Sequence, residues 1–343
     1  MSLKNQFKEK FGVDLNEMIS RFEASKAAKG KFDYDVDGLP AWTDNTLPNL
    51  TSDLVGNSEF LAELTLESGV KGTKEIALLN ADVTLQAKVG CSSTPDGSVV
   101  FTDKALTTHL LYAGIEFCNE DLNGKMTQIL NVLGVKAQNG QLPAEIETIL
   151  MAYLTRLLQR KAQRVVVLGD ESSLDPELAL FDGLVNLIES DITVANFTST
   201  ATAVTSSNAY DLAYGVFTKI NPEIFDNGMA VRLYTGRKEA LLILKQWNDT
   251  NPHSQVEIPV SGTSMRFMLP LTGIEVVTLP ELNALDAMYA IPTSLAFLGV
   301  DDEADMDLEI KYDAYNDKLK AEASFRLGTQ IVWGKYFTKL ILA

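Results

Sequence analysis

The side chains best suited to acid–base or metal chemistry at neutral pH are few and widely spaced in this sequence. Its two histidines are His109 and His253, and its two cysteines are Cys91 and Cys118. None of them stands at the short spacing from another that zinc sites use. We therefore expect both histidines to be surface or structural residues. We expect both cysteines to be free thiols, with a disulfide as the less favoured alternative, and we predict no metal site.

Motifs for phosphate binding and acyl transfer are also missing. The sequence contains no GxSxG elbow and no Walker loop, which removes the sequence support for nucleophile-elbow hydrolases and P-loop NTPases. The nearest nucleotide-like string is residues 234–238 (YTGRK), which are predicted to end a strand and open a helix, a position that could hold an anion. The string has a single glycine, so ordinary helix capping is the favoured interpretation.

Two charged clusters are further candidates. Residues 301–307 (DDEADMD) offer the oxygen ligands that hard cations prefer, but they lack the glycine and the distal glutamate of an EF-hand loop. We interpret them as a solvated acidic turn. Arg156, Arg160 and Arg164 recur every four residues on one predicted helix. Three positive charges cannot give an acidic chain a nucleic-acid-binding face, so we expect salt bridges with acidic neighbours, in this chain or in another subunit.

These residues predict neither a catalytic nor a cofactor-binding site, so the chain is predicted not to be an enzyme. One kind of enzyme stays an alternative. Carboxylates far apart in the sequence, such as Glu145 and Asp286, could be brought together by the fold and would leave no motif.

Composition limits the class of protein further. A length of 343 residues suggests about two domains, and 46% hydrophobic with 22% charged residues is typical of a globular protein. The sequence has no apolar run suited to a secretory signal or a membrane span, so we expect a soluble chain of intracellular origin. The formal net charge of −17 argues against a protein whose task is to grip phosphate backbones. It is compatible with one that lies beside nucleic acid without adhering.

Before residue 60 the sequence predicts a helix followed by an extended arm. Residues 4–28 carry apolar side chains at helical spacing, and residues 30–57 are rich in Asp, Gly, Pro, Thr and Asn. A stretch this long without secondary structure is uncommon inside a compact domain. We expect it to lie as an arm on another surface, either of this chain or of another subunit.

Residues 60–117 are predicted to be rich in β-structure. Apolar and polar side chains alternate between residues 82 and 89, the pattern of a half-buried strand, and the turn sequences SGVKG and STPDG lie on either side. A long hairpin has few core residues of its own, so we expect it to pack against a partner. Val83 and Leu85 are its candidate contact residues.

Helical periodicity is clearest in residues 142–164, where Pro143 stands near the start and Gly169 follows the end. This predicts a helix of about 20 residues, about 30 Å long. A second helix is predicted over residues 176–188, and a surface loop or weak strand over 191–207. The chain then alternates between helices and strands: a helix near 208–220, a turn at 221–228, a strand at 229–234, a helix at 236–247 capped by Thr235, strands near 264–269, 273–279 and 286–291, and a strand at 319–327.

Local sequences and the order of the predicted elements resemble one known family. Residues 168–170 (LGD) and 180–184 (LFDGL) look like the segment that follows the long helix in that family. Residues 291–292 (IP) and 321–332 (AEASFRLGTQIV) are similar to its C-terminal part, where a basic strand residue precedes a glycine. An arm, a long hairpin, a long helix, a mixed α/β region and a late long strand follow in the same order. The family is the major capsid proteins of tailed bacteriophages, whose fold is shared with encapsulin shells and the floor domain of herpesvirus capsids.

The resemblance covers nearly the whole chain and implies an α+β fold, that of the tailed-phage major capsid protein. The parts that it implies are an N-terminal arm (1–58), an extended β-hairpin loop (59–106), a peripheral domain with a long spine helix (107–200, with returning strands at 300–330), and an axial α/β domain (201–299, with the C-terminal tail 331–343).

The same resemblance implies a structural protein whose hexamers and pentamers form an icosahedral shell around the double-stranded DNA of a tailed phage. Such a protein would be made in the cytoplasm of the host bacterium and would end in the virion capsid. A scaffold, a portal and decoration proteins are candidate partners, and neither a cofactor nor a membrane is expected. An acidic inner face would keep packed DNA from adhering, because like charges repel within about a Debye length. An encapsulin-type compartment shell and a tail or baseplate protein are the alternatives.

For subunit contacts, the resemblance implies that the hairpin lies over a neighbour's long helix and that the arm crosses a further neighbour. The contact candidates are Val83, Leu85, Arg156, Arg160 and Arg164. Because the sequence begins with methionine and its first predicted helix is short, we expect no cleaved N-terminal scaffolding segment. Nothing in the sequence selects a lysine for the Lys–Asn crosslink of some family members, and none is predicted.

Overall fold

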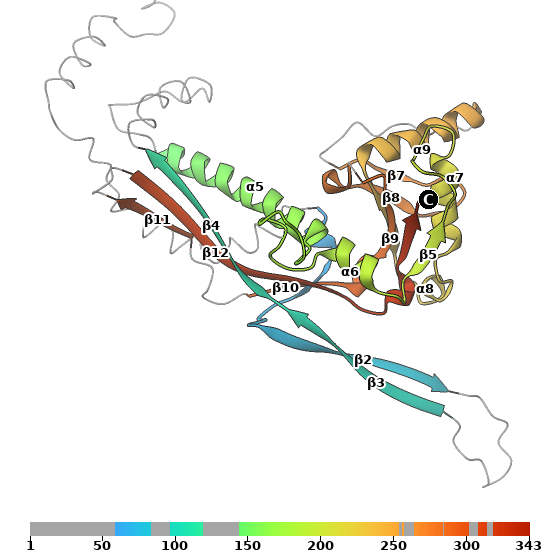
Figure 1. Ribbon diagram of the computed structural model, residues 1–343, viewed down its shortest axis with the longest axis horizontal. Helices are drawn as coiled ribbons and strands as arrows, with labels where there is room; N and C mark the ends of the chain where they lie inside the picture. The colour runs from blue at the N-terminus through green and yellow to red at the C-terminus, as the bar shows by residue number, and fades with distance from the viewer. Residues whose placement is uncertain are drawn as a thin grey trace, which may run out of the picture. The chain divides into compact units, whose positions relative to one another are not determined.

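The computed structural model (Figure 1) divides the chain into two compact units, Met1–Asp44 and Asn45–Ala343. All described residues belong to the second unit, and they are residues 59–83, 97–118, 144–253, 256, 264–283, 285–301, 308–313 and 318–343. The predicted N-terminal helix and arm (1–58) lie outside the described residues. So do Leu85, Cys91 and residues 302–307 of the acidic run.

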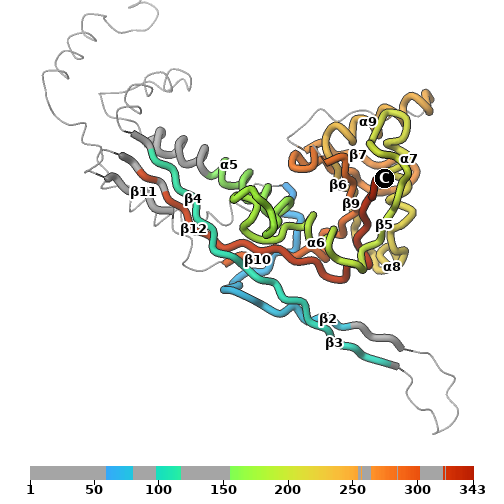
Figure 2. The backbone as a smooth tube through the Cα atoms, viewed as in Figure 1, coloured from blue at the N-terminus to red at the C-terminus, as the bar shows by residue number. Residues whose placement is uncertain are grey.

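The first sheet has five strands and is built around the long strand β12. Leu327 of β12 pairs with both His109 of β4 and Val300 of β10, so β4 and β10 lie on opposite edges of β12. β11 pairs with the N-terminal part of β12, and β1 pairs in parallel with β10. Figure 2 shows β4 running beside β12. The bounds are β1 (Thr65–Glu67), β4 (His109–Cys118), β10 (Ala296–Val300), β11 (Leu308–Asp313) and β12 (Lys318–Ile331).

The side-chain alternation predicted for residues 319–327 is confirmed where the structure describes it. Ala323, Phe325 and Leu327 are buried. Ser324 and Arg326 between them, and Lys320 and Glu322 before them, are partly exposed. One face of β12 therefore belongs to the core.

The long helix predicted over residues 142–164 is confirmed as α5 (Ala144–Leu168), which at 25 residues is longer than expected. Its last turn is apolar, and residues 165–167 are all buried, as expected for a helical segment that is hydrophobic on every side. The helix ends at Gly169, whose N–H donates to the Val165 carbonyl at 2.8 Å. α5 packs against β12 and α6.

The second predicted helix, over residues 176–188, is wrong in its first half. Residues 171–183 form turns and irregular chain, and α6 spans Leu184–Ser190. The chain turns here so that Gly183 can lie against the end of α5, where its N–H donates to the Gly169 carbonyl at 2.9 Å. A side chain at position 183 would collide with the backbone of α5. Tertiary packing, which the helical pattern does not contain, therefore decides this segment.

The second sheet has six strands in the order β5-β13-β9-β6-β8-β7. Helices α7 and α9 pack against each other, α7 also packs against β9, and α9 packs against β8. This confirms the predicted alternation of helices and strands, including the weak strand within 191–207. The bounds are β5 (Ala195–Thr198), α7 (Ala209–Thr218), α8 (Glu223–Asp226), β6 (Val231–Thr235), α9 (Arg237–Thr250), β7 (Arg266–Met268), β8 (Glu275–Thr278), β9 (Met288–Pro292) and β13 (Thr338–Ile341). Short 3₁₀ turns are η2 (Leu61–Glu63), η3 (Pro280–Leu282), η4 (Thr293–Leu295) and η5 (Gly334–Tyr336).

Two details of this region differ from the prediction. Residues 221–228, predicted to be a turn, contain the short helix α8. Thr235 does not cap α9; its hydroxyl donates to the Ala287 carbonyl at 2.9 Å, and Gly236 occupies the N-cap position. Because Thr235 ends a central strand and is fully buried, its side chain bonds to the neighbouring turn instead of the helix.

The predicted long hairpin is confirmed as a two-stranded sheet of β2 (Thr73–Val83) and β3 (Gly97–Thr107), which pair antiparallel throughout. The predicted turn SGVKG precedes it, and Gly69 and Gly72 in this turn have the positive φ that glycine adopts most readily. Within the described residues no third strand pairs with the hairpin (Figure 1).

The root of the hairpin lies in a notch formed by two paired glycines, Gly299 of β10 and Gly328 of β12. A β-carbon on Gly328 would meet the backbone carbonyl of Thr107. One on Gly299 would meet side-chain atoms of Thr108 and Leu106. The close approach of backbone to backbone therefore requires glycine at position 328.

Hydrogen bonds fix this root in place. The buried hydroxyl of Thr108 donates to the Val70 carbonyl at 2.8 Å, and the Thr108 N–H donates to the Gly72 carbonyl at 2.7 Å. From β12, the side-chain amide of Gln330 donates to the Ala105 carbonyl at 2.7 Å. The hairpin is thus attached at its base to the first sheet.

Gly328→Ala is expected to lower the free energy of unfolding by about 1–3 kcal/mol, because its methyl group must displace backbone. Gly299→Ala is the matched control and should cost less, because the Thr108 and Leu106 side chains can shift. Chemical denaturation followed by circular dichroism compares the two variants. An equal loss of stability in both would contradict the backbone notch.

Candidate functional site

One face of the hairpin is apolar and exposed. Leu79 pairs with Phe101 across the ribbon, and Val99 lies two residues from Phe101, so the three side chains share a face. Phe101 is 72% exposed, Val99 57% and Leu79 54%. A two-stranded ribbon cannot bury such a face by itself, and an exposed apolar patch of this kind marks a contact site. We call these three side chains the hairpin face.

Of the two predicted contact residues on the hairpin, the structure describes Val83. Val83 is the last residue of β2 and pairs with Gly97. Leu85 lies outside the described residues, so its role stays a prediction. None of the three residues of the hairpin face belongs to the alternating stretch 82–89. Leu79 precedes that stretch on β2, and Val99 and Phe101 lie on β3.

The three arginines of α5 differ in their surroundings. Arg164 is paired within the chain, with Glu177 at 2.9 Å and Asp175 at 3.3 Å. This is the predicted kind of salt bridge, made inside one subunit. Arg156 and Arg160 are exposed, and a role for them in contacts with another subunit stays a prediction.

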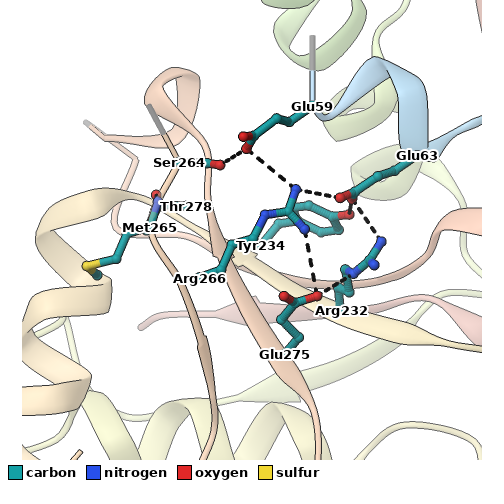
Figure 3. Close-up of polar contacts among 9 residues, drawn as sticks. All are labelled: Glu59, Glu63, Arg232, Tyr234, Ser264, Met265, Arg266, Glu275 and Thr278. Atoms are coloured by element: carbon teal, nitrogen blue, oxygen red, sulfur yellow. Dashed lines mark hydrogen bonds and ion pairs between the residues drawn. The ribbon is translucent and has the colours of Figure 1, made fainter. Parts of the chain in front are cut away.

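A cluster of charged side chains holds the segment before β1 against the second sheet (Figure 3). Its centre is the carboxylate of Glu63 in η2. The Tyr234 hydroxyl donates to Glu63 Oε2 at 2.7 Å, and Arg232 Nη1 lies 3.0 Å from the same oxygen. Arg266 Nη2 donates to Glu63 Oε1 at 2.6 Å. We call the whole set the Glu63 cluster, and its members are Glu59, Glu63, Arg232, Tyr234, Arg266 and Glu275.

A second carboxylate completes the cluster from β8. Glu275 Oε2 accepts a hydrogen bond from Arg232 Nε at 2.7 Å and lies 3.8 Å from Arg266 Nη1. Glu59 Oε2 lies 3.6 Å from Arg266 Nη2 and accepts a hydrogen bond from the Ser264 hydroxyl. Figure 3 shows both guanidinium groups lying between the carboxylates of Glu63 and Glu275.

Three members of the Glu63 cluster, Tyr234, Arg232 and Arg266, have raised pKa values. Burial, followed by the charge and hydrogen bond of Glu63, raises the pKa of Tyr234 above its ordinary 10.0. Partial burial works to lower the pKa of Arg232, but the hydrogen bond to Glu275 and the charge of Glu63 outweigh it and the pKa is raised. The same balance, with Glu63 as the main partner, raises the pKa of Arg266. None of these three groups exchanges a proton near neutral pH, so the cluster acts as a clamp and not as an acid–base site.

The sequence analysis did not identify the Glu63 cluster. Arg232 and Glu275 are direct partners on the parallel strands β6 and β8. Their opposite charges could have indicated this ion pair only if the register of the two strands had been known. Arg266 and Glu63 come from two further elements, at a separation of 203 positions. No spacing within one element links them.

The residues that the sequence offered for chemistry are not brought into a common site. His109 stacks on the ring of Phe181 at 6.0 Å between centroids, and His253 is exposed. Asp301, the first residue of the acidic run, is 1% exposed and lies 3.8 Å from Arg326 Nε. For this residue the prediction of a solvated turn is wrong, because it directly follows β10 and lies beside β12.

The start of α9 agrees with the interpretation of residues 234–238 as an ordinary helix start and not an anion site. They end β6 and open the helix, and the Arg237 N–H donates to Asn283 Oδ1 at 2.7 Å. A neutral amide thus bonds to one of the N–H groups that an anion would use. Asp286, named as a carboxylate of a dispersed site, accepts a hydrogen bond from Lys238 at 3.0 Å. Glu145 belongs to α5.

In the described part of the chain, no three His, Cys, Asp or Glu side chains gather closely enough to hold a metal ion. Among the described helices, none is both long and apolar enough to cross a membrane.

Comparison with protein families finds no matching family model, and no curated protein matches in sequence. Solved structures do match. A chain of the satellite phage P4 procapsid, a structure that includes the size determination (Sid) protein, is 9% identical with a TM-score of 0.56 over 86% of this chain and 98% of that chain. A chain in the capsid of an empty GTA particle is 10% identical with a TM-score of 0.57, over 82% of this chain and 89% of that one. A chain in the capsid of Myoviridae phage XM1 is 10% identical with a TM-score of 0.51, over 82% and 90%. These likenesses confirm the predicted α+β fold.

Proposed function

We propose that this chain, whose fold is that of chains in phage capsids and procapsids, is a structural major capsid protein. Copies of it would assemble through hexamers and pentamers into an icosahedral shell around the double-stranded DNA of a tailed phage. The observation that carries the proposal, beside the fold, is the hairpin face. A monomer would leave this face in water at a cost of about 25 cal/mol for each Å² of apolar surface.

The partner of the hairpin face, in this proposal, is the long helix α5 of a neighbouring copy. Arg156 and Arg160 are exposed on this helix. In a chain with a net charge of −17, basic groups at contacts would offset the repulsion between copies. Val83 and Leu85 would extend the contact toward the tip of the hairpin.

The proposed division into parts follows the two sheets. The first sheet with α5 and α6 would be the peripheral domain, and the second sheet with α7, α8 and α9 the axial domain. Three strands cross the predicted boundaries. β5 pairs with β13 of the second sheet, β10 pairs with β12 of the first, and β1, which lies in the predicted hairpin loop, pairs with β10 of the first sheet. The proposed domains are therefore interleaved along the chain.

The proposed role is structural and involves no catalysis. A phage capsid is favoured over an encapsulin shell, because the matching structures named above come from phage and GTA particles. In such a shell the acidic chain would keep packed DNA from adhering. A scaffold, a portal and decoration proteins would be further partners, with synthesis in the host bacterium and a final place in the virion.

Expression of the full chain, followed by sedimentation velocity and negative-stain electron microscopy, tests the proposal. We expect capsomer-sized rings or closed shells that sediment far faster than one chain of 37.6 kDa. A well-behaved monomer at high protein concentration would contradict it.

A further inference from the structure

The first turn of α9 contains a carboxyl group that is completely buried. Glu239 is 0% exposed, and neither of its carboxyl oxygens accepts a hydrogen bond of ordinary geometry from the described residues. Its nearest cation is Lys238, whose Nζ lies 3.7 Å from Glu239 Oε1 and whose side chain is 61% exposed. An ionised carboxylate in such a place is expensive unless donors compensate it.

A second carboxyl group, that of Asp286, lies near the same ammonium group as Glu239. Asp286 lies in the turn before β9 with a left-handed backbone, φ 45°. One of its oxygens accepts a hydrogen bond from Lys238 Nζ at 3.0 Å. Two carboxyl groups that lie this close to one ammonium group, at 3.7 Å and 3.0 Å from Lys238 Nζ, repel each other when both are ionised. Because Lys238 bonds directly to Asp286, the negative charge belongs there and the proton belongs on Glu239.

This carboxyl pair joins two segments that also meet through other bonds. Asn283 Oδ1 accepts the hydrogen bond of the Arg237 N–H, and the Thr235 hydroxyl bonds to the Ala287 carbonyl. The start of α9 is thus held at several points to Asn283 and to the turn at residues 285–287.

We propose that Glu239 is a neutral carboxylic acid that donates its proton to the Asp286 carboxylate, and that this shared proton is a pH-sensitive latch between the start of α9 and the turn at residues 285–287. The latch is closed at mildly acidic pH. It loosens as the pH rises, when Glu239 loses its proton and two adjacent carboxylates repel each other.

Electrostatics around the pair support this geometry. Burial is the main cause that raises the pKa of Glu239 above its ordinary 4.5. The interaction with its own backbone N–H opposes this rise, the neighbouring Asp286 adds to it, and the charge of Lys238 opposes it. The hydrogen bond from Lys238 is the main cause that lowers the pKa of Asp286 below 3.8. The other charged groups on adjoining elements are directed elsewhere: Arg237 is exposed, Glu281 of η3 bonds to Gln163 of α5, and Asp211 of α7 bonds to Gln246.

The sign of the pH dependence follows from these directions. The contribution of Glu239 to stability is fully present below its unfolded pKa and is lost as the pH rises through its higher folded pKa. The contribution of Asp286 is present above its unfolded pKa and is lost as the pH falls through its lower folded pKa. The pair therefore stabilises the fold most under mildly acidic conditions.

Infrared spectroscopy and thermal denaturation of the full chain test the latch between about pH 5 and about pH 8.5. The wild type should keep the carbonyl band of a protonated carboxylic acid above the pH at which free glutamate is ionised, and Glu239→Gln should lack that band. The melting temperature of the wild type should fall relative to that of Glu239→Gln by about 2–4 °C across this range. Glu171→Gln, which changes an exposed acid, is the control and should keep the wild-type profile.

A second variant keeps the test decisive if Glu239→Gln does not fold. Asp286→Asn retains an acceptor for the Glu239 proton but removes the opposing charge, so the protonated-carboxyl band should vanish at a lower pH than in the wild type. The proposal fails if Glu239→Gln retains the band, or if Asp286→Asn titrates as the wild type does.

Discussion

Phe101→Asp is expected to prevent the formation of rings and shells while leaving the subunit folded. The side chain is 72% exposed in the single chain, so its replacement removes almost no intramolecular packing. In the proposed assembly the same position would be buried against a neighbour, where an unpaired carboxylate costs several kcal/mol at every contact. Because each copy makes this contact, the loss is repeated around the shell. Sedimentation velocity and negative-stain microscopy measure assembly, and circular dichroism measures folding.

Thr102→Asp is the matched control for this prediction. Thr102 is the next residue of β3, is also exposed, and faces the opposite side of the ribbon because it pairs with Leu78. It introduces the same charge on the same strand, so we expect particles to form. Normal particles from Phe101→Asp, or equal loss of assembly in both variants, would show that the hairpin face is not the contact.

Glu63→Gln is expected to lower the free energy of unfolding by about 2–4 kcal/mol. The change leaves Arg232 and Arg266 partly buried, at 26% and 30% side-chain exposure, without the more buried of the two carboxylates that they share, and Glu275 alone remains between them. Breaking a fully buried pair costs about 3–5 kcal/mol, and the remaining solvent access reduces this figure. Urea denaturation followed by circular dichroism measures the change.

Glu67→Gln provides the comparison for the Glu63 cluster. Glu67 pairs with Lys74 at 2.6 Å, and at 30% and 48% exposure both side chains are more exposed than Glu63, at 14%. An exposed pair of this kind contributes about 0–1 kcal/mol. If Glu63→Gln costs no more than Glu67→Gln, the Glu63 cluster does not act as a clamp.

Periodicity within single elements was sufficient to predict much of the fold. The helical repeat of 142–164 and the strict alternation of 319–327 identified α5 and the central part of β12, because each pattern has the period of the element that it forms. The turn residues before β2 identified the start of the hairpin. The order of these elements then indicated the capsid fold, which the structural comparisons confirm.

Features that depend on distant segments could not be predicted in this way. The apolar residues of 176–188 have the spacing of one helix. The backbone before residue 184 is nevertheless irregular, because Gly183 packs closely against the end of α5. Asp301 reads as part of a solvated acidic run, yet it is buried beside Arg326. The Glu63 cluster joins η2, β6, β7 and β8, and the sequence contains no record of which strands are neighbours.

The central position of β12 also governs when the subunit can fold. The carbonyl of Ala105, at the root of the hairpin, accepts its hydrogen bond from Gln330, which is synthesised 225 positions later. At ~5–20 residues per second, synthesis of that interval takes roughly 10–45 s. β1 and β4 leave the ribosome long before their partners β10 and β12 are synthesised. Pairing between segments so far apart in the sequence is also intrinsically slow. The root of the hairpin can form only on a finished chain, and truncated products therefore lack the fixed hairpin that assembly would require.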